Sequence, residues 1–209
     1  EFPVPMVVGG VGAVKGRSPL FSNIAAYLSP GKPPRFYEKN IRVPFGEVTP
    51  GIGLVPQWLR EKLDIPVGTI AAGTTNPPFE LGGKIFRNLI CYEATLPGYF
   101  RRAARGSDFL VNVTEDIWYG RTAHVPQHAS VLCLRVVENR TPLLRATNVG
   151  PSGVLNPSGR FVRGKTTFQS EKITVDLKAG SLCTVYQRGG CCLSALLLWL
   201  ALLRASLGL

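Results

Sequence analysis

Three side chains in this sequence could together carry out covalent chemistry: Cys91 in ICYE, Lys39 in FYEKN and Glu47 in VPFGE. A thiolate is a nucleophile, and a nearby ammonium group favours the thiolate and can stabilise an oxyanion. A carboxylate could take the thiol proton and pass it to a leaving group. Spacing alone does not establish these contacts, so a buried, inert Cys91 at the end of an apolar strand stays open as the alternative.

The spacing of the two histidines suggests a metal site, but the residues around them argue against one. His124 and His128 are the only two histidines and lie four residues apart, as zinc ligands on one helix face would. Pro126 lies between them, and no carboxylate or thiol stands nearby at a convincing ligand spacing. The glycines of VVGGVGAVKG also fit neither the dinucleotide nor the phosphate-loop pattern. We therefore expect no metal site and no nucleotide site.

The composition allows a full hydrophobic core and an anionic partner. The chain has 209 residues, of which 45% are hydrophobic, and this is enough for one large domain or two small ones. Its 24 basic and 13 acidic residues give a net charge of +11, which is typical of proteins that meet phospholipid surfaces or nucleic acid. The basic residues are scattered and no RNA-binding motif is present, so we expect no nucleic-acid partner. Five cysteines without paired spacing argue against a disulfide framework.

The elements that must position these residues alternate between apolar strands and helices. In the stretch 127–139, the residues Ala129, Leu132, Cys133, Val136 and Val137 form one buried helical stripe, with Arg135 and Glu138 outside it. A second helix is predicted over 99–105. Strands are predicted over 6–9, 23–28, 68–72, 85–91, 109–113 and 143–148. The mixture predicts an α/β domain whose sheet packs against helices.

The end of the chain differs in composition from the rest. Residues 191–209 carry one charge, Arg204, and leave no polar helix face. A bilayer core takes about 20 residues of helix, so the segment is just long enough, or is a truncated span. We therefore predict two parts: a catalytic domain over 1–186 and a transmembrane helix over 187–209.

Five stretches of the sequence, in order along the chain, resemble one known family. They are FYEKNIRVPFGEVTP, LICYE, FLVNVTEDIWYG, PQHASVLCLRVVENRTPLLRATNVGPSGVLNPSGR and TVYQRGG. Together they resemble the nitrilase-like (carbon–nitrogen hydrolase) domain of bacterial apolipoprotein N-acyltransferases, followed by that family's last transmembrane helix. The resemblance implies a nitrilase-like α-β-β-α sandwich, incomplete at its N-terminus.

The resemblance also implies a reaction. Cys91 would attack a phospholipid ester and become a thioester, and Lys39 would stabilise the oxyanion. The lipidated N-terminal cysteine of an apolipoprotein would then take the acyl group through its amine, in a ping-pong transfer without a cofactor. The implied location is the bacterial inner (cytoplasmic) membrane, with the domain on its periplasmic side. Supporting positions are Glu47, Tyr92 and Glu93 around the site, and Trp118 and Tyr119 near the acyl-chain entrance.

Two features depart from the family pattern. The family's third catalytic residue is a glutamate on an earlier strand, and Glu1 lies too close to the strand at 6–9 to be that residue. Because the only methionine is Met6, we interpret the chain as the C-terminal part of a longer protein and expect it to be inactive by itself. Glu115 stands where the family usually has asparagine. The alternatives are a soluble-type carbon–nitrogen hydrolase, such as an amidase or carbamoylase, and a non-catalytic remnant that binds lipid through its basic surface.

Overall fold

The fold contains two β-sheets. A computed structural model of the chain describes residues 3–13, 21–63, 70–163, 172–180 and 182–206. The first sheet has three antiparallel strands in the order β1 (Met6–Ala13), β2 (Phe21–Leu28) and β3 (Arg35–Glu38). The second has six strands in chain order: β4 (Phe79–Leu81), β5 (Lys84–Ile90), β6 (Phe109–Thr114), β7 (Leu143–Thr147), β8 (Gly153–Leu155) and β9 (Phe161–Arg163). In it β5, β6 and β7 are parallel, and the outer strands pair antiparallel.

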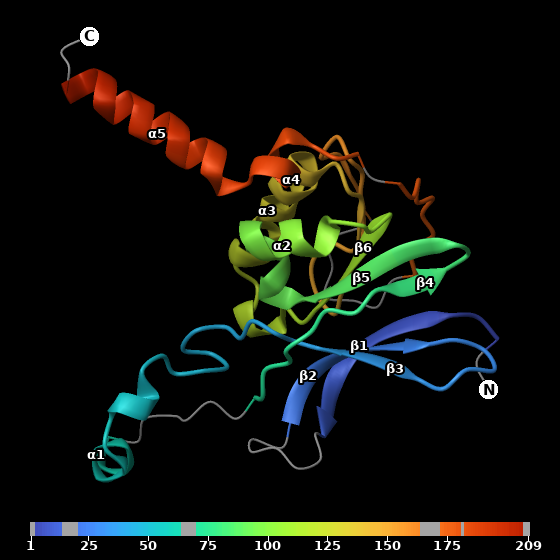
Figure 1. Cartoon of the computed structure of the whole chain (residues 1–209). Helices are drawn as coiled ribbons and strands as arrows, with labels where there is room; N and C mark the ends of the chain where they lie inside the picture. Colours follow the sequence, from blue (N-terminus) through green and yellow to red (C-terminus); the bar gives the residue numbers. More distant parts are fainter. Residues whose placement is uncertain (1–2, 14–20, 64–69, 164–171, 181, 207–209) are drawn as a thin grey trace.

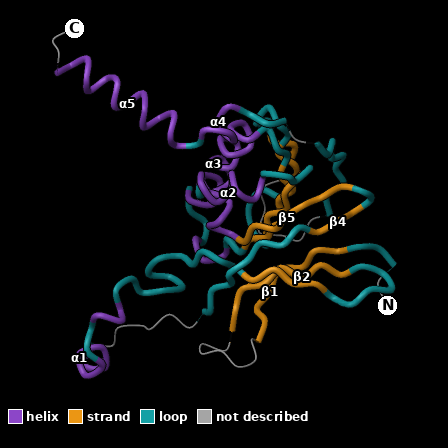
Figure 2. The backbone as a smooth tube through the Cα atoms, viewed as in Figure 1, coloured by secondary structure: helices purple, strands orange, loops and turns teal. Residues whose placement is uncertain are grey.

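The helices are short, with two exceptions. The longer ones are α3 (His124–Asn139) and α5 (Cys191–Ser206). The α-helices α1 (Gln57–Lys62), α2 (Pro97–Ala104) and α4 (Val185–Gly189), and the 3-10 turns η1 (Ile52–Leu54), η2 (Cys91–Thr95) and η3 (Ile117–Tyr119), complete the described set. Figure 2 shows that helix lies on one side of the larger sheet, while α1 and α5 extend away from the body.

Successive side chains of β5 point to opposite faces of the sheet and pack into two different hydrophobic cores. Phe86 and Ile90 point to one face and pack with Ala25 and Tyr37 of the smaller sheet. Leu89 points to the other face and packs beneath α2 and α3. The central strands are therefore buried on both faces, which explains their nearly continuous apolar sequence. The described residues form three layers, with helices on one sheet and the second sheet below it (Figure 1).

The α/β prediction is confirmed, with corrections to individual elements. The strands predicted over 6–9, 23–28, 109–113 and 143–148 correspond to β1, β2, β6 and β7, and the helices over 99–105 and 127–139 to α2 and α3. The strand predicted over 85–91 ends one residue earlier, because Cys91 begins a turn. No strand is described at 70–72, where Ile70 makes one bridge to Phe21, and 68–69 lie outside the described residues. Of the predicted four-layer sandwich, the described residues show both sheets and one helical layer.

The buried stripe of α3 also needs correction. Ala129, Leu132 and Val136 are buried as predicted, whereas Val137 is 38% exposed. Arg135, predicted to lie outside the core, is buried, and its guanidinium donates to Glu138 Oε1 at 2.6 Å.

The transmembrane helix predicted over 187–209 falls on two described helices, and residues 207–209 lie outside the described residues. Residues 187–189 belong to α4, and Gly190, with φ 54°, separates α4 from α5. Within the described part of the chain, no helix is both long and apolar enough to cross a membrane.

Candidate active site

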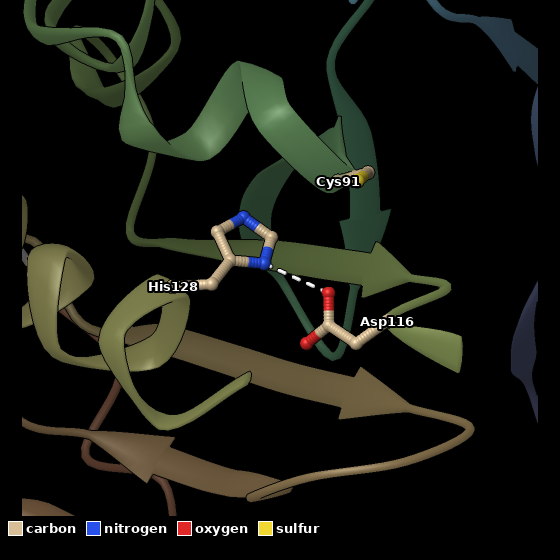
Figure 3. A group of neighbouring side chains, drawn as sticks. All are labelled: Cys91, Asp116 and His128. Carbon is tan, nitrogen blue, oxygen red and sulfur yellow. Dashed lines mark hydrogen bonds and ion pairs between the residues drawn. The ribbon is translucent and has the colours of Figure 1, made fainter. Parts of the chain in front are cut away.

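Cys91 occupies a strained turn at the carboxyl end of β5. The strand ends at Ile90, and Cys91 begins η2 with φ 50°, in the left-handed region. A residue other than glycine held there costs about 1–3 kcal/mol, so the surrounding contacts must fix it. The side chain is half-buried at the edge of the core between the sheets, and Figure 3 shows it at the start of the turn. The sulfur therefore sits where the sheet meets its loops.

Glu93, in the same turn, provides that fixation. Its side chain is fully buried, and burial raises the pKa of Glu93 above the usual range, while its hydrogen bonds act in the opposite direction. Each carboxylate oxygen accepts two hydrogen bonds. The donors are the backbone N–H groups of Asn40 (2.6 Å), Ile41 (2.9 Å) and Ile90 (2.8 Å) and the hydroxyl of Tyr37 (2.7 Å).

These contacts bring two distant segments together. Asn40 and Ile41 directly follow Lys39, whereas Ile90 directly precedes Cys91. Glu93 therefore fastens the turn that carries the thiol to the segment that carries the lysine, although the two are far apart in the chain.

Buried Lys39 forms an ion pair with half-buried Glu47. Lys39 is fully buried, and its Nζ donates to both oxygens of Glu47 at 2.8 and 2.7 Å. Glu47 also accepts hydrogen bonds from Asn23 Nδ2 at 2.6 Å and from the Val43 N–H at 2.8 Å. The eight-residue spacing thus places the two side chains in contact, and the carboxylate is held as an acceptor.

A second buried ionic cluster lies beside Cys91. Asp116 follows β6, and its Oδ1 lies 2.8 Å from Nδ1 of His128 on α3, while its Oδ2 accepts from Arg145 on β7. Arg145 also donates to Asn112 Oδ1 at 2.7 Å. Burial lowers the pKa of Arg145, whereas negative charge at Asp116 and Cys91 acts to raise it. Figure 3 shows the hydrogen bond between His128 and Asp116, with Cys91 on the neighbouring turn.

The cluster fits an ion-pair network better than a metal site. Potential ligand atoms of Cys91, Asp116 and His128 lie within 4.8 Å of one another, and thiolate, carboxylate and imidazole all bind zinc. Both oxygens of Asp116 are already engaged, however, and the guanidinium of Arg145 would repel a bound cation. His124 does not join the cluster: its ring lies 4.0 Å from that of Tyr119.

Tyr119 lies close enough to Glu47 of the ion pair and to Asp116 of the second cluster for both charges to affect its pKa. Burial raises the pKa of Tyr119, and negative charge at Cys91, Asp116 and Glu47 raises it further, so the phenol lies in the field of all three. Trp118, predicted beside it near the acyl entrance, is 82% exposed. Tyr92 is half-buried, and its carbonyl accepts from the Thr95 hydroxyl.

Comparison with known proteins gives the family. Residues 9–186 match the carbon–nitrogen hydrolase family. The chain belongs to this family. The chain is 35% identical over 150 residues to an apolipoprotein N-acyltransferase of Geobacter metallireducens, covering 71% of the chain and 28% of that relative. It is 32% identical over 176 residues to one of Chromobacterium violaceum, covering 84% and 33%. The chain thus spans about a third or less of the length of these curated relatives.

Solved structures show the same fold. An amidase from Nesterenkonia sp. superimposes with a TM-score of 0.57 at 20% identity, covering 88% of the chain and 63% of the amidase. Nit3 of Saccharomyces cerevisiae, a nitrilase-superfamily member, gives a TM-score of 0.58 at 17% identity over 79% of the chain and 57% of its own. The fold is therefore nitrilase-like.

Sequence reasoning missed three buried residues of the ionic cluster beside Cys91: Asp116, His128 and Arg145. Because β5, β6 and β7 are parallel, their carboxyl ends meet at one edge, and a rule based on strand ends would have found Asp116. Arg145 within the apolar strand LLRAT also signals a buried cation that needs a partner. His128 was considered only as a zinc ligand.

Proposed function

We propose that this carbon–nitrogen hydrolase domain is the acyl-transfer domain of an apolipoprotein N-acyltransferase. The similarity to two such enzymes supports the assignment. The observation that carries it is the position of Glu93, which fastens the turn of Cys91 to the segment of Lys39. This supports the proposal because the candidate nucleophile, at the end of β5, and the buried cation, at the end of β3, are carried by segments that contact each other through Glu93.

In the proposed reaction, the Cys91 sulfur attacks the ester carbonyl of a phospholipid. The carbonyl oxygen becomes an oxyanion, which the ammonium of Lys39 stabilises. The carbon–oxygen bond then breaks, the lysophospholipid leaves as an alcohol, and the acyl chain remains on sulfur as a thioester. The α-amine of the apolipoprotein's lipidated N-terminal cysteine attacks this thioester, which forms an amide and releases the thiol.

Both proposed substrates, a phospholipid and a lipidated protein, are anchored in lipid, so the proposed reaction takes place at a membrane. A net charge of +11 suits an anionic headgroup surface. The segment from Asn40 through α1 presents the apolar side chains of Phe45, Leu54 and Trp58 to solvent, at 80%, 90% and 63% exposure. It directly follows Lys39 and includes Glu47. We place the domain at the periplasmic face of the bacterial inner membrane, with Trp118 and Tyr119 near the acyl-chain entrance.

An activated ester tests the nucleophile directly. We expect p-nitrophenyl palmitate in detergent to give a palmitoyl adduct on Cys91, because nitrophenolate leaves without a proton from the protein. Intact mass and peptide mapping measure the adduct, with Cys91→Ala as the control. An adduct on another residue, or an equal adduct in Cys91→Ala, would overturn the assignment.

The fate of the thioester separates the proposed transferase from a hydrolase. Although we expect the chain by itself not to react with phospholipid, a palmitoyl group loaded on Cys91 from the activated ester should pass to the amine of a synthetic peptide with a dipalmitoylglyceryl N-terminal cysteine, which gains one palmitoyl mass. Release as free palmitate, with the peptide unchanged, would instead show a hydrolase of the amidase type.

A further inference from the structure

A chain of hydrogen bonds runs through two buried tyrosines to the carboxylate of Glu93. The Tyr37 hydroxyl on β3 lies 2.7 Å from Glu93 Oε2 and 2.8 Å from the Tyr99 hydroxyl on α2. Asn40 Nδ2 donates to the Tyr99 hydroxyl at 2.6 Å. Tyr37 is fully buried, and Tyr99 is 8% exposed. The hydrogen bonds therefore lie inside the protein and join β3 and α2 to the turn η2, which carries Cys91.

The direction of each hydrogen bond follows from the two ends of this chain. The other three partners of Glu93 are backbone N–H groups, which only donate, so Glu93 is an acceptor and the Tyr37 proton points to it. The Tyr37 oxygen then accepts from Tyr99, whose own oxygen accepts from the amide nitrogen of Asn40. Burial and the charge of Glu93 raise the pKa of both tyrosines, which keeps their protons in place. All these hydrogen bonds point toward the carboxylate, and hydrogen bonds arranged in this way polarise one another.

The hydrogen bonds return to the segment that carries Lys39. Asn40 directly follows Lys39 in the sequence. It donates its side-chain Nδ2 to Tyr99 and its backbone N–H to Glu93 Oε1, the latter at 2.6 Å. The hydrogen bonds therefore form a closed ring that starts and ends at Asn40 and passes through both tyrosines and the carboxylate. In such a ring the carboxylate cannot rotate or shift without breaking a hydrogen bond.

We propose that Tyr37 and Tyr99 are positioning residues, which act through the Glu93 carboxylate. They hold the thiol of Cys91 where the ammonium of Lys39 can stabilise the oxyanion. The same carboxylate accepts from the backbone N–H directly before Cys91, so a shift of the carboxylate moves the turn. A misplacement of reacting groups by about 1 Å can cost about 100-fold in rate. The role rests on the proposed function, in which the thiol and the ammonium act on one acyl group.

Tyr27 offers a matched control for Tyr37. Both tyrosines belong to the hydrophobic core between the sheets, and Tyr27 is 8% exposed. The Tyr27 hydroxyl donates to the backbone carbonyl of Glu80 on β4 at 2.8 Å. Replacing either tyrosine by phenylalanine keeps the ring and removes a hydroxyl that donates to an oxygen. Only the change at Tyr37 removes a donor to Glu93, so the pair separates a loss of stability from a loss of positioning.

The first test measures how fast p-nitrophenyl palmitate acylates Cys91 in the folded variants. We expect Tyr37→Phe to react about tenfold more slowly than the unmodified chain, because the carboxylate that fixes the turn loses a donor. Tyr99→Phe removes the next hydroxyl in the ring and should react about threefold more slowly. Tyr27→Phe should keep the rate of the unmodified chain. Equal rates in Tyr37→Phe and Tyr27→Phe would overturn the proposal.

Alkylation by iodoacetamide gives a readout that loss of stability alone would move differently. It requires the Cys91 thiolate but forms no oxyanion, so Lys39 is not needed to stabilise one. We expect the ratio of acylation to alkylation at Cys91 to fall about tenfold in Tyr37→Phe and to stay constant in Tyr27→Phe. Cys133, which packs against the core beneath α2 and α3, should alkylate at an unchanged rate. Slow acylation together with faster alkylation of Cys133 would assign the loss to unfolding and overturn the proposal.

A measurement on the hydroxyl proton keeps the proposal testable if Tyr37→Phe does not fold. NMR of the chain with labelled tyrosine should show the Tyr37 hydroxyl proton as a slowly exchanging signal that moves in Tyr99→Phe and not in Tyr27→Phe. The absence of this signal, or a signal that Tyr99→Phe leaves unchanged, would overturn the proposal. Acylation of Cys91 at the full rate in Tyr37→Phe would reject the positioning role and leave the proposed function standing. No acylation of Cys91 in the unmodified chain would instead overturn the proposed function.

Discussion

The carboxylate of Glu93 connects the Cys91 turn to the Lys39 segment through hydrogen bonds. The effect of replacing it on stability can be measured. In Glu93→Gln, an amide nitrogen replaces one oxygen and faces groups that themselves donate, so at least one buried donor loses its acceptor. We expect the free energy of unfolding to fall by about 1–3 kcal/mol in urea denaturation. Glu115→Gln is the matched control, because Glu115 is exposed and should change stability by less than about 0.5 kcal/mol. Equal losses in the two variants would contradict this role.

The types of residue in the sequence were enough to predict part of the candidate site but not the rest. Cys91, Lys39 and Glu47 were predicted from their chemistry, and the structure places Lys39 against Glu47. The cluster around Asp116 could not be predicted in the same way. Its contacts depend on the register that sets Asn112 opposite Arg145, and on α3 packing against the sheet. Such long-range pairings leave no local pattern in the sequence.

At the scale of elements, α3 offers a matched pair of leucines. Leu132 is fully buried against the six-stranded sheet, and Leu134, two residues later, is 60% exposed. We expect Leu132→Ala to lower the free energy of unfolding by about 2–5 kcal/mol, because it leaves a cavity in the core. Leu134→Ala should cost less than about 0.5 kcal/mol. Both variants keep the same helix propensity, so similar losses would mean that the helix packs differently.

The longer strands were predicted correctly from the sequence, whereas the short strands were not. The strands of five or more residues were found, because they carry enough apolar positions to show a pattern. The missed strands β3, β4, β8 and β9 have only three or four residues each. Their positions depend on pairing with longer neighbours, which their own sequences do not specify. The end of β5 also depends on a contact outside the strand: the Ile90 N–H donates to the Glu93 side chain, and the turn begins at Cys91.

At the scale of the whole molecule, two apolar segments extend from the layered body. The turn and helix around α1 and the helix α5 both project outward in Figure 1. Along α5, all apolar side chains from Leu196 to Leu200, together with Leu202 and Leu203, are between 40% and 62% exposed. Exposed apolar surface of this extent marks a contact with lipid or protein. Combined with a net charge of +11, it gives the chain both attractions that hold proteins at a phospholipid surface.

The two attractions can be separated by salt. Electrostatic attraction to anionic lipid weakens as the Debye length falls from about 10 Å at 0.1 M salt to about 3 Å at 1 M, whereas burial of leucine does not. We expect the chain to float with vesicles of phosphatidylcholine and phosphatidylglycerol at both salt concentrations. Leu198→Gln with Leu202→Gln, which leaves the charge unchanged, should float at low salt and at least tenfold less at 1 M. The control pair Leu182→Gln and Val185→Gln removes apolar side chains, each 70% exposed, outside α5 and should float like the unmodified chain. If the α5 variant kept full flotation at 1 M salt, another surface would hold the protein on lipid.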